Sequence, residues 1–114
     1  MFVCAYRELC KSNSTKLIEL LDIFNKTALE VCEGQQLDMN YEQVQKISIA
    51  QYLKMIELKT AVLLGCSMQL GAIIAGADNE EQKLIYDFGK NIGIAFQLQD
   101  DILDVYATKE KFGK

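Results

Sequence analysis

The chain contains no histidine, no proline and no tryptophan, and Arg7 is its only arginine. The lack of histidine excludes metal sites built from histidine and carboxylates, and it excludes Ser-His and Cys-His nucleophilic catalysis. The lack of proline, together with only 7 glycines in 114 residues, favours long uninterrupted helices. Because 50% of the residues are hydrophobic, the composition predicts an all-α domain with a packed core.

Basic residues are in the minority, with 12 lysines and arginines against 16 aspartates and glutamates. A nucleic-acid-binding protein normally carries a basic stripe, so no nucleic acid is expected as a partner. No basic segment precedes an apolar one at the N-terminus, so no signal peptide is expected. The longest apolar stretch, 61–77, is interrupted by Ser67 and Gln69, which favours a buried helix over a transmembrane segment. We therefore expect a cytoplasmic protein.

The cysteines show no metal-binding pattern. Cys4, Cys10, Cys32 and Cys66 form no Cys-x-x-Cys pair, and each lies among apolar residues where a small hydrophobic side chain would fit. Structural free thiols in a reducing compartment are therefore favoured over a disulfide or zinc framework.

Apolar residues at helical spacing predict helices over 1–10, 15–39 and 48–75, and a last helix from 78 onward. Two of these helices begin with a capping box, Ser48 with Gln51 and Asp78 with Glu81. Asn13 or Ser14 is the expected N-cap of the second helix, and Gly76 is the expected end of the third.

The second helix continues its inward face into two polar residues. Its apolar residues recur at steps of 4, 3, 4 and 3, and the next positions in the series are Gln35 and Asp38. Either this polar pair stays on the inward face or the helix end emerges into solvent, and periodicity alone leaves both open. The apolar residues of the series are Leu17, Leu21, Phe24, Ala28 and Val31.

Lys59 falls on the apolar stripe of the third helix, between Met55 and Val62. A lysine at such a position either extends its ammonium outward to solvent or is held inside to meet an anion. Thr60 beside it is either a compromise within the helix or a second hydrogen-bond donor.

Three aspartates, Asp100, Asp101 and Asp104, stand in a segment rich in Ile, Leu, Phe and Val. On a helix these carboxylates share one surface with Gln97, and mutual repulsion costs roughly a few tenths of a kcal/mol per pair. A bound cation would remove that cost, and carboxylate oxygens without histidine or paired thiolates suit Mg²⁺. An exposed helix end with scattered charge also explains the aspartates when they are considered alone.

Three motifs occur in a fixed order. Glu33-Gly34-Gln35-Gln36-Leu37-Asp38 comes first and Glu57-Leu58-Lys59-Thr60-Ala61 second. Phe96-Gln97-x-x-Asp100-Asp101-x-x-Asp104 comes third, preceded by Phe88-Gly89-x-x-x-Gly93 and followed by Gly113-Lys114. They resemble the Gly-Gln-x-x-Asp, Lys-Thr and second aspartate-rich motifs of the trans-isoprenyl diphosphate synthases, the polyprenyl synthetase family.

The resemblance implies an all-α enzyme of the class I isoprenoid synthase type, folded as an antiparallel bundle of long helices. Such enzymes ionise an allylic prenyl diphosphate with the help of magnesium, add isopentenyl diphosphate to the carbocation and release diphosphate. The implied cofactor is Mg²⁺, with Mn²⁺ as a substitute, and the implied metal ligands are Asp100, Asp101 and Asp104, with Asp100 the most direct. The resemblance implies catalytic roles for Lys59, Thr60 and Gln97 and substrate contacts by Gln35, Asp38, Lys59, Thr60, Phe96, Gln97 and Lys114.

The sequence also departs from the family pattern. No second Asp-Asp pair occurs in the chain, so the first aspartate-rich motif is missing, as are the basic residues that build the isopentenyl diphosphate pocket. We therefore expect residues 1–114 to be the central part of one incomplete isoprenoid synthase domain, without turnover of its own. Product chain length is not readable from these residues.

Two alternatives to a catalytic synthase remain open. In the first, the chain is a non-catalytic helical subunit or remnant that dimerises with a complete synthase. A class I terpene cyclase fits less well, because those enzymes seldom combine a Lys-Thr motif with Phe-Gln-x-x-Asp-Asp. The resemblance further implies a homodimer formed through the first two helices.

Overall fold

The structure is a computed structural model that describes residues 2–11, 15–44 and 46–111, with side chains described from residue 3 and as far as Val105. The described residues form helices and no strand, which confirms the all-α prediction. The elements are α1 (Phe2–Cys10), α2 (Leu17–Tyr41), α3 (Ile49–Ile56), the π-helix η1 (Glu57–Ala61), α4 (Val62–Ile74) and α5 (Asn79–Lys111).

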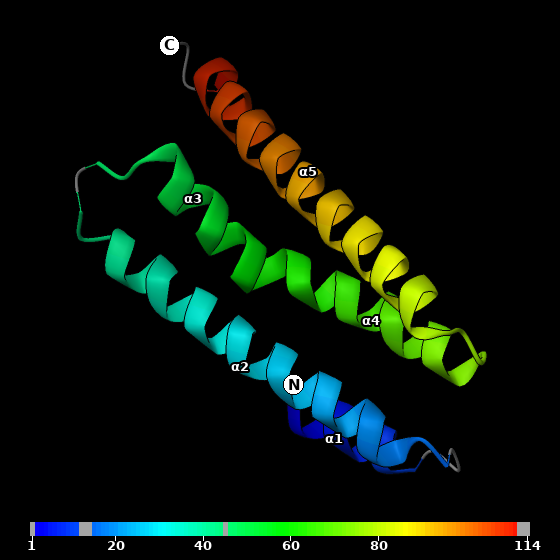
Figure 1. Cartoon of the computed structure of the whole chain (residues 1–114). Helices are drawn as coiled ribbons and strands as arrows, with labels where there is room; N and C mark the ends of the chain where they lie inside the picture. Colours follow the sequence, from blue (N-terminus) through cyan, green and yellow to red (C-terminus); the bar gives the residue numbers. More distant parts are fainter. Residues whose placement is uncertain (1, 12–14, 45, 112–114) are drawn as a thin grey trace.

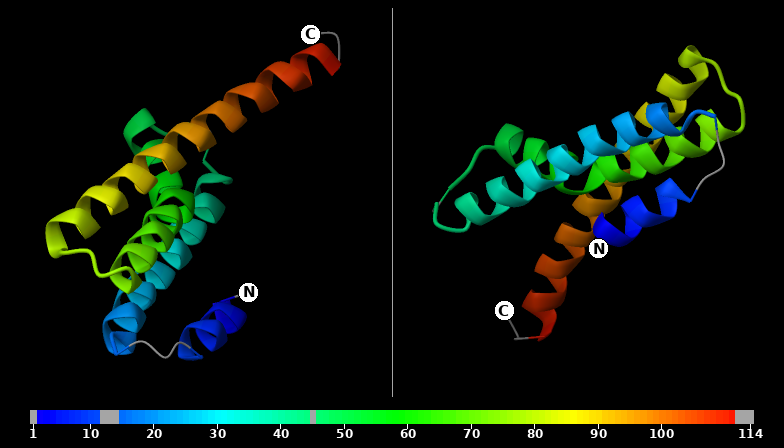
Figure 2. Two further views of the ribbon diagram at one scale, coloured as in Figure 1. Left: turned by 90° about the vertical axis from the view of Figure 1, so that its right-hand side faces the viewer. Right: turned by 90° about the horizontal axis from the view of Figure 1, so that it is seen from below.

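The elements form a layer of three long rods with a short helix on one side (Figure 1). α3, η1 and α4 join end to end into a central rod, which lies between α2 and α5. α2 and α5 each pack on this rod, and among the described residues no Cα atom of α2 lies within 8 Å of a Cα atom of α5. α1 packs against α2, and the C-terminal end of α5 projects beyond the other helices (Figure 2).

The predicted helix starts and ends are mostly confirmed. The Ser48 hydroxyl accepts the backbone N–H of Gln51 at 3.0 Å, and the Gln51 side chain accepts the N–H of Ser48 at 2.8 Å. Asp78 and Glu81 make the same reciprocal pair at 2.8 and 3.1 Å. Gly76 takes a φ of +91° just after α4, a conformation that favours glycine.

The start of α2 differs from the prediction. Its N-cap position is Lys16, which makes no side-chain capping hydrogen bond. Asn13 and Ser14, the predicted caps, lie outside the described residues.

The apolar core lies between α2 and the central rod. Its most deeply buried side chains are Leu20 of α2 and Val62, Cys66 and Ile73 of α4. α1 docks onto this core through Tyr6, whose ring meets Phe24 edge to face with centroids 4.7 Å apart. The contact between these two rings fixes the short helix on the face of α2.

The prediction that every cysteine fills an apolar site is wrong for three of the four. Cys66 is 1% exposed, whereas Cys4, Cys10 and Cys32 are exposed to solvent. All four are free thiols. Successive residues of a helix point in different directions. The apolar residues next to the three exposed cysteines in the sequence therefore lie on other faces of their helices.

α5 crosses the central rod at two glycines, Gly89 and Gly93, which have no side chain to keep the two helices apart. A Cβ atom built on Gly93 would lie 2.9 Å from Cα of Ala61, and one on Gly89 would lie 3.1 Å from Cα of Gly65. At these positions the backbones themselves touch. The result is a fixed register between α5 and the π-helix.

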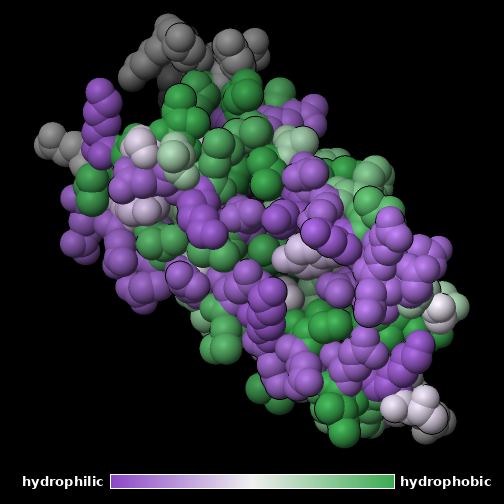
Figure 3. All heavy atoms as spheres, viewed as in Figure 1, coloured by the Kyte–Doolittle hydropathy of each residue, from purple (hydrophilic) through white to green (hydrophobic). Residues whose placement is uncertain are grey.

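The outer face of α5 is apolar and has no partner among the described residues. Leu84, Phe88, Phe96, Ile102 and Leu103 are each more than half exposed. In the view of Figure 3, hydrophobic side chains show along the upper part of the edge where α5 runs, whereas hydrophilic ones gather over the middle of the layer and at the lower right.

One described stretch, Ile49–Ile74, is long and apolar enough to cross a membrane by length and composition. This stretch is the central rod, which contacts α2 on one side and α5 on the other. A core helix passes the same length and hydropathy test, and the position between two packed helices is that of a core helix.

Candidate functional site

The central rod changes from an α-helix to a π-helix over Glu57–Ala61, the Glu-Leu-Lys-Thr-Ala segment. A π-turn accommodates one extra residue in the helix, so it rotates the side chains within it relative to an α-helix, and such turns are frequent at functional sites. The sequence predicts an unbroken helix here, because hydrophobic spacing does not reveal one inserted residue. The π-turn therefore adds a local rearrangement at Lys59 and Thr60.

Gly34 of α2 lies directly against the backbone of this π-turn. A Cβ atom at position 34 would be 2.3 Å from the backbone nitrogen of Lys59 and 2.7 Å from the carbonyl carbon of Leu58. No side chain fits at these distances. Gly34, the glycine of the Gly-Gln-x-x-Asp motif, thus allows α2 to contact the backbone of Lys59, the charged residue of the Lys-Thr motif.

Lys59 and Asp38 form an ion pair across the same contact, with 2.5 Å between Nζ and Oδ2. Their side chains are 38% and 28% exposed, so the pair lies at the edge of the core. The Asp38 side chain therefore faces the central rod instead of solvent, and the Lys59 ammonium is paired with its carboxylate. A lysine ammonium carries three N–H donors, so this pair leaves donors for a second anion.

Asp101 is the best-held carboxylate of the aspartate-rich motif. The Tyr52 hydroxyl of α3 donates to one of its oxygens, and Nε2 of Gln97 donates to the other at 3.0 Å. Burial, then the hydrogen bond and the charge of Asp101, raise the pKa of Tyr52 to about 12. The hydroxyl therefore remains protonated at neutral pH, and the bond ties α3 to α5.

Sequence reasoning did not identify Tyr52 as a site residue. It stands near the start of its helix among apolar residues, and the hydrogen bond spans 49 positions along the chain. Nothing in the sequence around Tyr52, one turn after the capping residue Ser48, indicates that its hydroxyl bonds to Asp101.

Glu57, the first residue of the π-turn, forms a second link to α5. Its carboxylate lies 3.3 Å from Nζ of Lys90 and 3.4 Å from Nζ of Lys54. Partial burial acts to raise the pKa of Glu57, but the hydrogen bonds and charges of Lys90 and Lys54 outweigh it and lower the pKa overall. The π-turn is thus held by α2 through Gly34 and by α5 through Lys90.

The other predicted site residues are not brought into contact with these pairs. Thr60 is partly buried inside the π-turn, and Gln35 is exposed on α2. Phe96 is 63% exposed, on the apolar outer surface of α5. Asp100 and Asp104 are exposed, and Lys114 lies outside the described residues.

The aspartates do not form a self-contained metal cage. Among the side chains that the structure describes, no group of three or more His, Cys, Asp or Glu residues is close enough to hold a metal ion. Asp101 is engaged by Tyr52 and Gln97, which leaves Asp100 and Asp104 as open carboxylates one helical turn apart. Mg²⁺ is commonly bound by one or two carboxylates together with phosphate oxygens, and these residues fit that arrangement.

Known proteins resemble the chain over most of its length. The sequence matches the polyprenyl synthetase family over residues 1–114. The geranylgeranyl diphosphate synthase of Methanosarcina mazei is 38% identical over 104 residues, covering 91% of this chain and 32% of that protein. The structure of a geranylgeranyl pyrophosphate synthetase from Pyrococcus horikoshii matches with a TM-score of 0.86 at 38% identity, covering 99% of this chain and 35% of that one.

A further structural relative carries ligands. The polyprenyl synthase of Caulobacter crescentus, complexed with calcium and isoprenyl diphosphate, matches with a TM-score of 0.81 at 35% identity, covering 90% of this chain and 30% of that one. The present chain therefore spans about a third of the length of its relatives. These structures have the expected fold, and with the family match over all 114 residues they show that the chain belongs to the polyprenyl synthetase family.

Proposed function

We propose that the chain is the central part of an isoprenyl diphosphate synthase. The reaction is the condensation of an allylic prenyl diphosphate with isopentenyl diphosphate, which releases diphosphate. The observation that carries the proposal is the joining of the Gly-Gln-x-x-Asp and Lys-Thr motifs at one contact, Gly34 on the π-turn and Asp38 on Lys59, in a chain that matches the family throughout.

The residues of the π-turn bind and hold the allylic diphosphate. Lys59 donates from its ammonium to the diphosphate, while Asp38 fixes the direction of its side chain. Thr60, next in the turn, supplies a hydroxyl donor. The lysine charge stabilises the negative charge that develops on the diphosphate as the bond to the allylic carbon breaks.

The carboxylates of α5 form the opposing wall. Asp100 and Asp104 would hold Mg²⁺, or Mn²⁺ in its place, and Asp101 would be the third ligand through the lone pairs that Tyr52 and Gln97 do not use. The metal when bound would neutralise charge on the leaving diphosphate. Asp100 is exposed and uncommitted, whereas Tyr52 and Gln97 orient the carboxylate of Asp101. The Caulobacter relative is complexed with calcium and isoprenyl diphosphate, which supports the proposal that the present chain takes part in binding a divalent cation and a diphosphate.

The remaining two thirds of the protein complete the site. We propose that they supply the first aspartate-rich motif and the binding site for isopentenyl diphosphate, so the 114 residues alone have no turnover. We place the whole enzyme in the cytoplasm as a homodimer through α1 and α2. Val3, Ile18 and Leu29 on these helices are each more than 70% exposed, which supports an apolar contact with a second copy.

The test is an assay of the whole protein with farnesyl diphosphate, labelled isopentenyl diphosphate and Mg²⁺. We expect a longer prenyl diphosphate, no product after chelation of the metal, and loss of product in Asp100→Ala. Asp22→Ala, an exposed aspartate on α2, is the matched control and should retain activity. Full activity of folded Asp100→Ala would overturn the role of that residue.

The same assay separates the enzyme from a non-catalytic subunit. A subunit forms no product alone and changes the rate of a complete synthase when the two are mixed. Absence of product from the whole protein under all metal conditions, with such an effect on a partner, would replace the proposed activity.

A further inference from the structure

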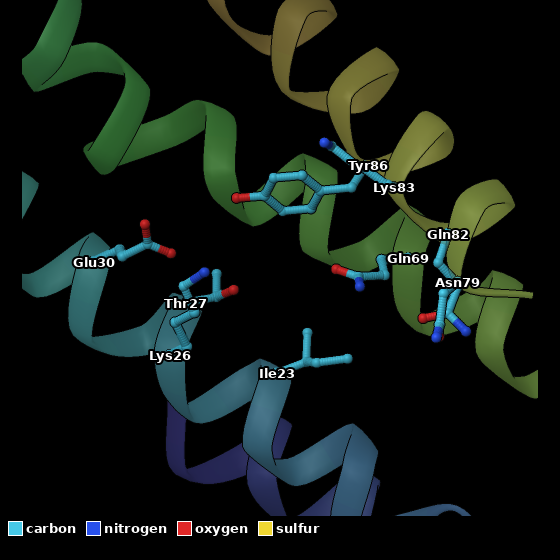
Figure 4. Close-up of a pocket in the computed structure, with 9 residues that line it drawn as sticks. All are labelled: Ile23, Lys26, Thr27, Glu30, Gln69, Asn79, Gln82, Lys83 and Tyr86. Atoms are coloured by element: carbon cyan, nitrogen blue, oxygen red, sulfur yellow. The ribbon is translucent and has the colours of Figure 1, made fainter.

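A cleft of about 350 Å³, lined largely by residues with polar side chains, lies between α2 and the beginning of α5, with α4 behind it (Figure 4). It lies toward the first half of both helices, and none of Asp38, Lys59 and Asp101 lines it. Its lining includes Lys26, Thr27 and Glu30 of α2 and Gln82, Lys83 and Tyr86 of α5.

The inner wall of this cleft contains buried polar side chains. Thr27 is 2% exposed and Gln82 is 8% exposed. Gln82 is fixed by its hydrogen bond from Nε2 to the carbonyl of Ala77, at 3.1 Å. Burying polar side chains costs free energy unless their polar atoms have hydrogen-bond partners.

Glu30 is the group that lacks such a partner. Its Oε1 atom is buried and accepts no hydrogen bond from any described residue. A buried carboxylate oxygen without a donor costs more than a neutral group in the same position, because the ionised form loses its hydration. A water molecule or a bound polar group in the cleft can supply the missing donor.

The groups that face Glu30 do not neutralise it. Tyr86 extends from α5 across the cleft with its hydroxyl directed toward the side on which Glu30 lies (Figure 4). Burial first, and then the charge of Glu30, raise the pKa of Tyr86 to about 12. On α4, burial raises the pKa of Cys66, the charge of Glu30 adds to this, and a hydrogen bond with Thr27 opposes it.

The two lysines of the cleft do not supply the missing charge either. Lys26 and Lys83 are exposed, and among the described residues no ion pair joins either of them to Glu30. The inner end of the cleft thus holds one carboxylate and a phenol hydroxyl, and the Lys90 ammonium lies 5.7 Å from the centre of the Tyr86 ring. An anion would meet the lysines at the mouth but would be repelled by Glu30 inside.

We propose that this cleft binds an ammonium or guanidinium group, which donates to the Glu30 carboxylate and lies beside the Tyr86 hydroxyl. Such a group has the charge and the N–H donors that the inner wall lacks. It has two sources: a small free amine, or a lysine or arginine side chain from the remainder of a longer synthase, a source that rests on the proposed function.

The site is tested on the full 114-residue chain by NMR titration of the backbone amides of Thr27, Glu30 and Tyr86. The probes are methylguanidinium and methylammonium, with tetramethylammonium as the matched cation that has no N–H donor. We expect saturable shifts with the first two probes and none with the third.

Substitutions identify the carboxylate that binds. Glu30→Gln keeps the size of the side chain and should raise the dissociation constant by about tenfold or more. Glu33→Gln removes the same charge from an exposed position one turn further along α2 and should change it by less than about twofold. Absence of a saturable shift in the wild-type chain, or equal binding by Glu30→Gln, overturns the proposal, as does preferential binding of inorganic phosphate.

The whole protein then separates the two sources. If the site takes a free amine, the probes bind the whole protein as they bind the chain. If a side chain of the remaining protein fills the site, the probes bind the chain but not the whole protein. In that case Glu30→Gln lowers the melting temperature of the whole protein more than that of the chain.

Discussion

Gly34 lies so close to Lys59 that a single added carbon at position 34 would sit 2.3 Å from the lysine backbone nitrogen. This contact joins two motifs whose touching residues, Gly34 and Lys59, are 25 positions apart in the sequence. It sets the distance between α2 and the π-turn, and with it the ion pair between Asp38 and Lys59.

Gly34→Ala is expected to destabilise the fold by about 1–3 kcal/mol or more, because the backbone of the π-turn has to move to admit the methyl group. Chemical denaturation of the 114-residue chain measures this change. Gly71→Ala is the matched control, since nothing lies within 4 Å of a Cβ at that helical position, and it should stabilise by about 0.5–1 kcal/mol. Equal stability of the two variants would contradict the close contact.

Tyr52→Phe is expected to destabilise the chain by about 1 kcal/mol at neutral pH, because the Asp101 carboxylate loses a donor. The pKa of Tyr52 is raised in the folded state from 10.0 to about 12, so the stability it contributes is complete below pH 10 and is lost as the pH rises toward 12. Unfolding free energies measured from pH 8 to 12 should fall more steeply for the wild type than for Tyr52→Phe. Parallel curves would show that this hydroxyl does not titrate with folding.

Glu57 is expected to make the chain sensitive to acid. Its pKa is lowered in the folded state, so its contribution is present above its usual pKa of 4.5 and is lost as the pH falls through the lowered value. Glu57→Gln should therefore flatten the decline of stability below pH 4.5, whereas Glu42→Gln, at an exposed position, should not. The decline is measured by denaturant titration at a series of acidic pH values, and an unchanged slope in Glu57→Gln would exclude the link to Lys90.

Lys59→Gln in the whole protein is expected to raise the KM for the allylic diphosphate by about tenfold or more, because a charge-assisted hydrogen bond to phosphate is lost. Lys59→Arg retains the charge and should recover part of the affinity. Lys46→Gln, an exposed lysine near the start of α3, serves as the control. Steady-state kinetics with varied allylic substrate make the comparison, and an unchanged KM in Lys59→Gln would remove this residue from the diphosphate site.

Features that depend on a few neighbouring residues were predictable from the sequence. The capping boxes at Ser48 and Asp78 and the end of α4 at Gly76 follow from side chains within four positions of each other. The all-α class follows from composition. The motif residues Asp38, Lys59 and Asp101 were identified by their order along the chain.

Features that depend on contacts between helices were not predictable. The π-turn at Glu57–Ala61 leaves the hydrophobic pattern almost unchanged, although it reorients Lys59. The bonds from Tyr52 to Asp101 and from Lys90 to Glu57 join residues that only packing brings together. Exposure of Cys4, Cys10 and Cys32 was missed for the same reason, since neighbours in sequence do not define the face of a helix.

A crystal structure of the whole protein with Mg²⁺ and a non-ionisable thiolodiphosphate analogue of the allylic substrate would test the proposed site most directly. We expect the diphosphate within about 3 Å of Nζ of Lys59 and a magnesium ion between its oxygens and the carboxylate of Asp100. A diphosphate bound away from the π-turn, with Asp100 free of metal, would contradict the site.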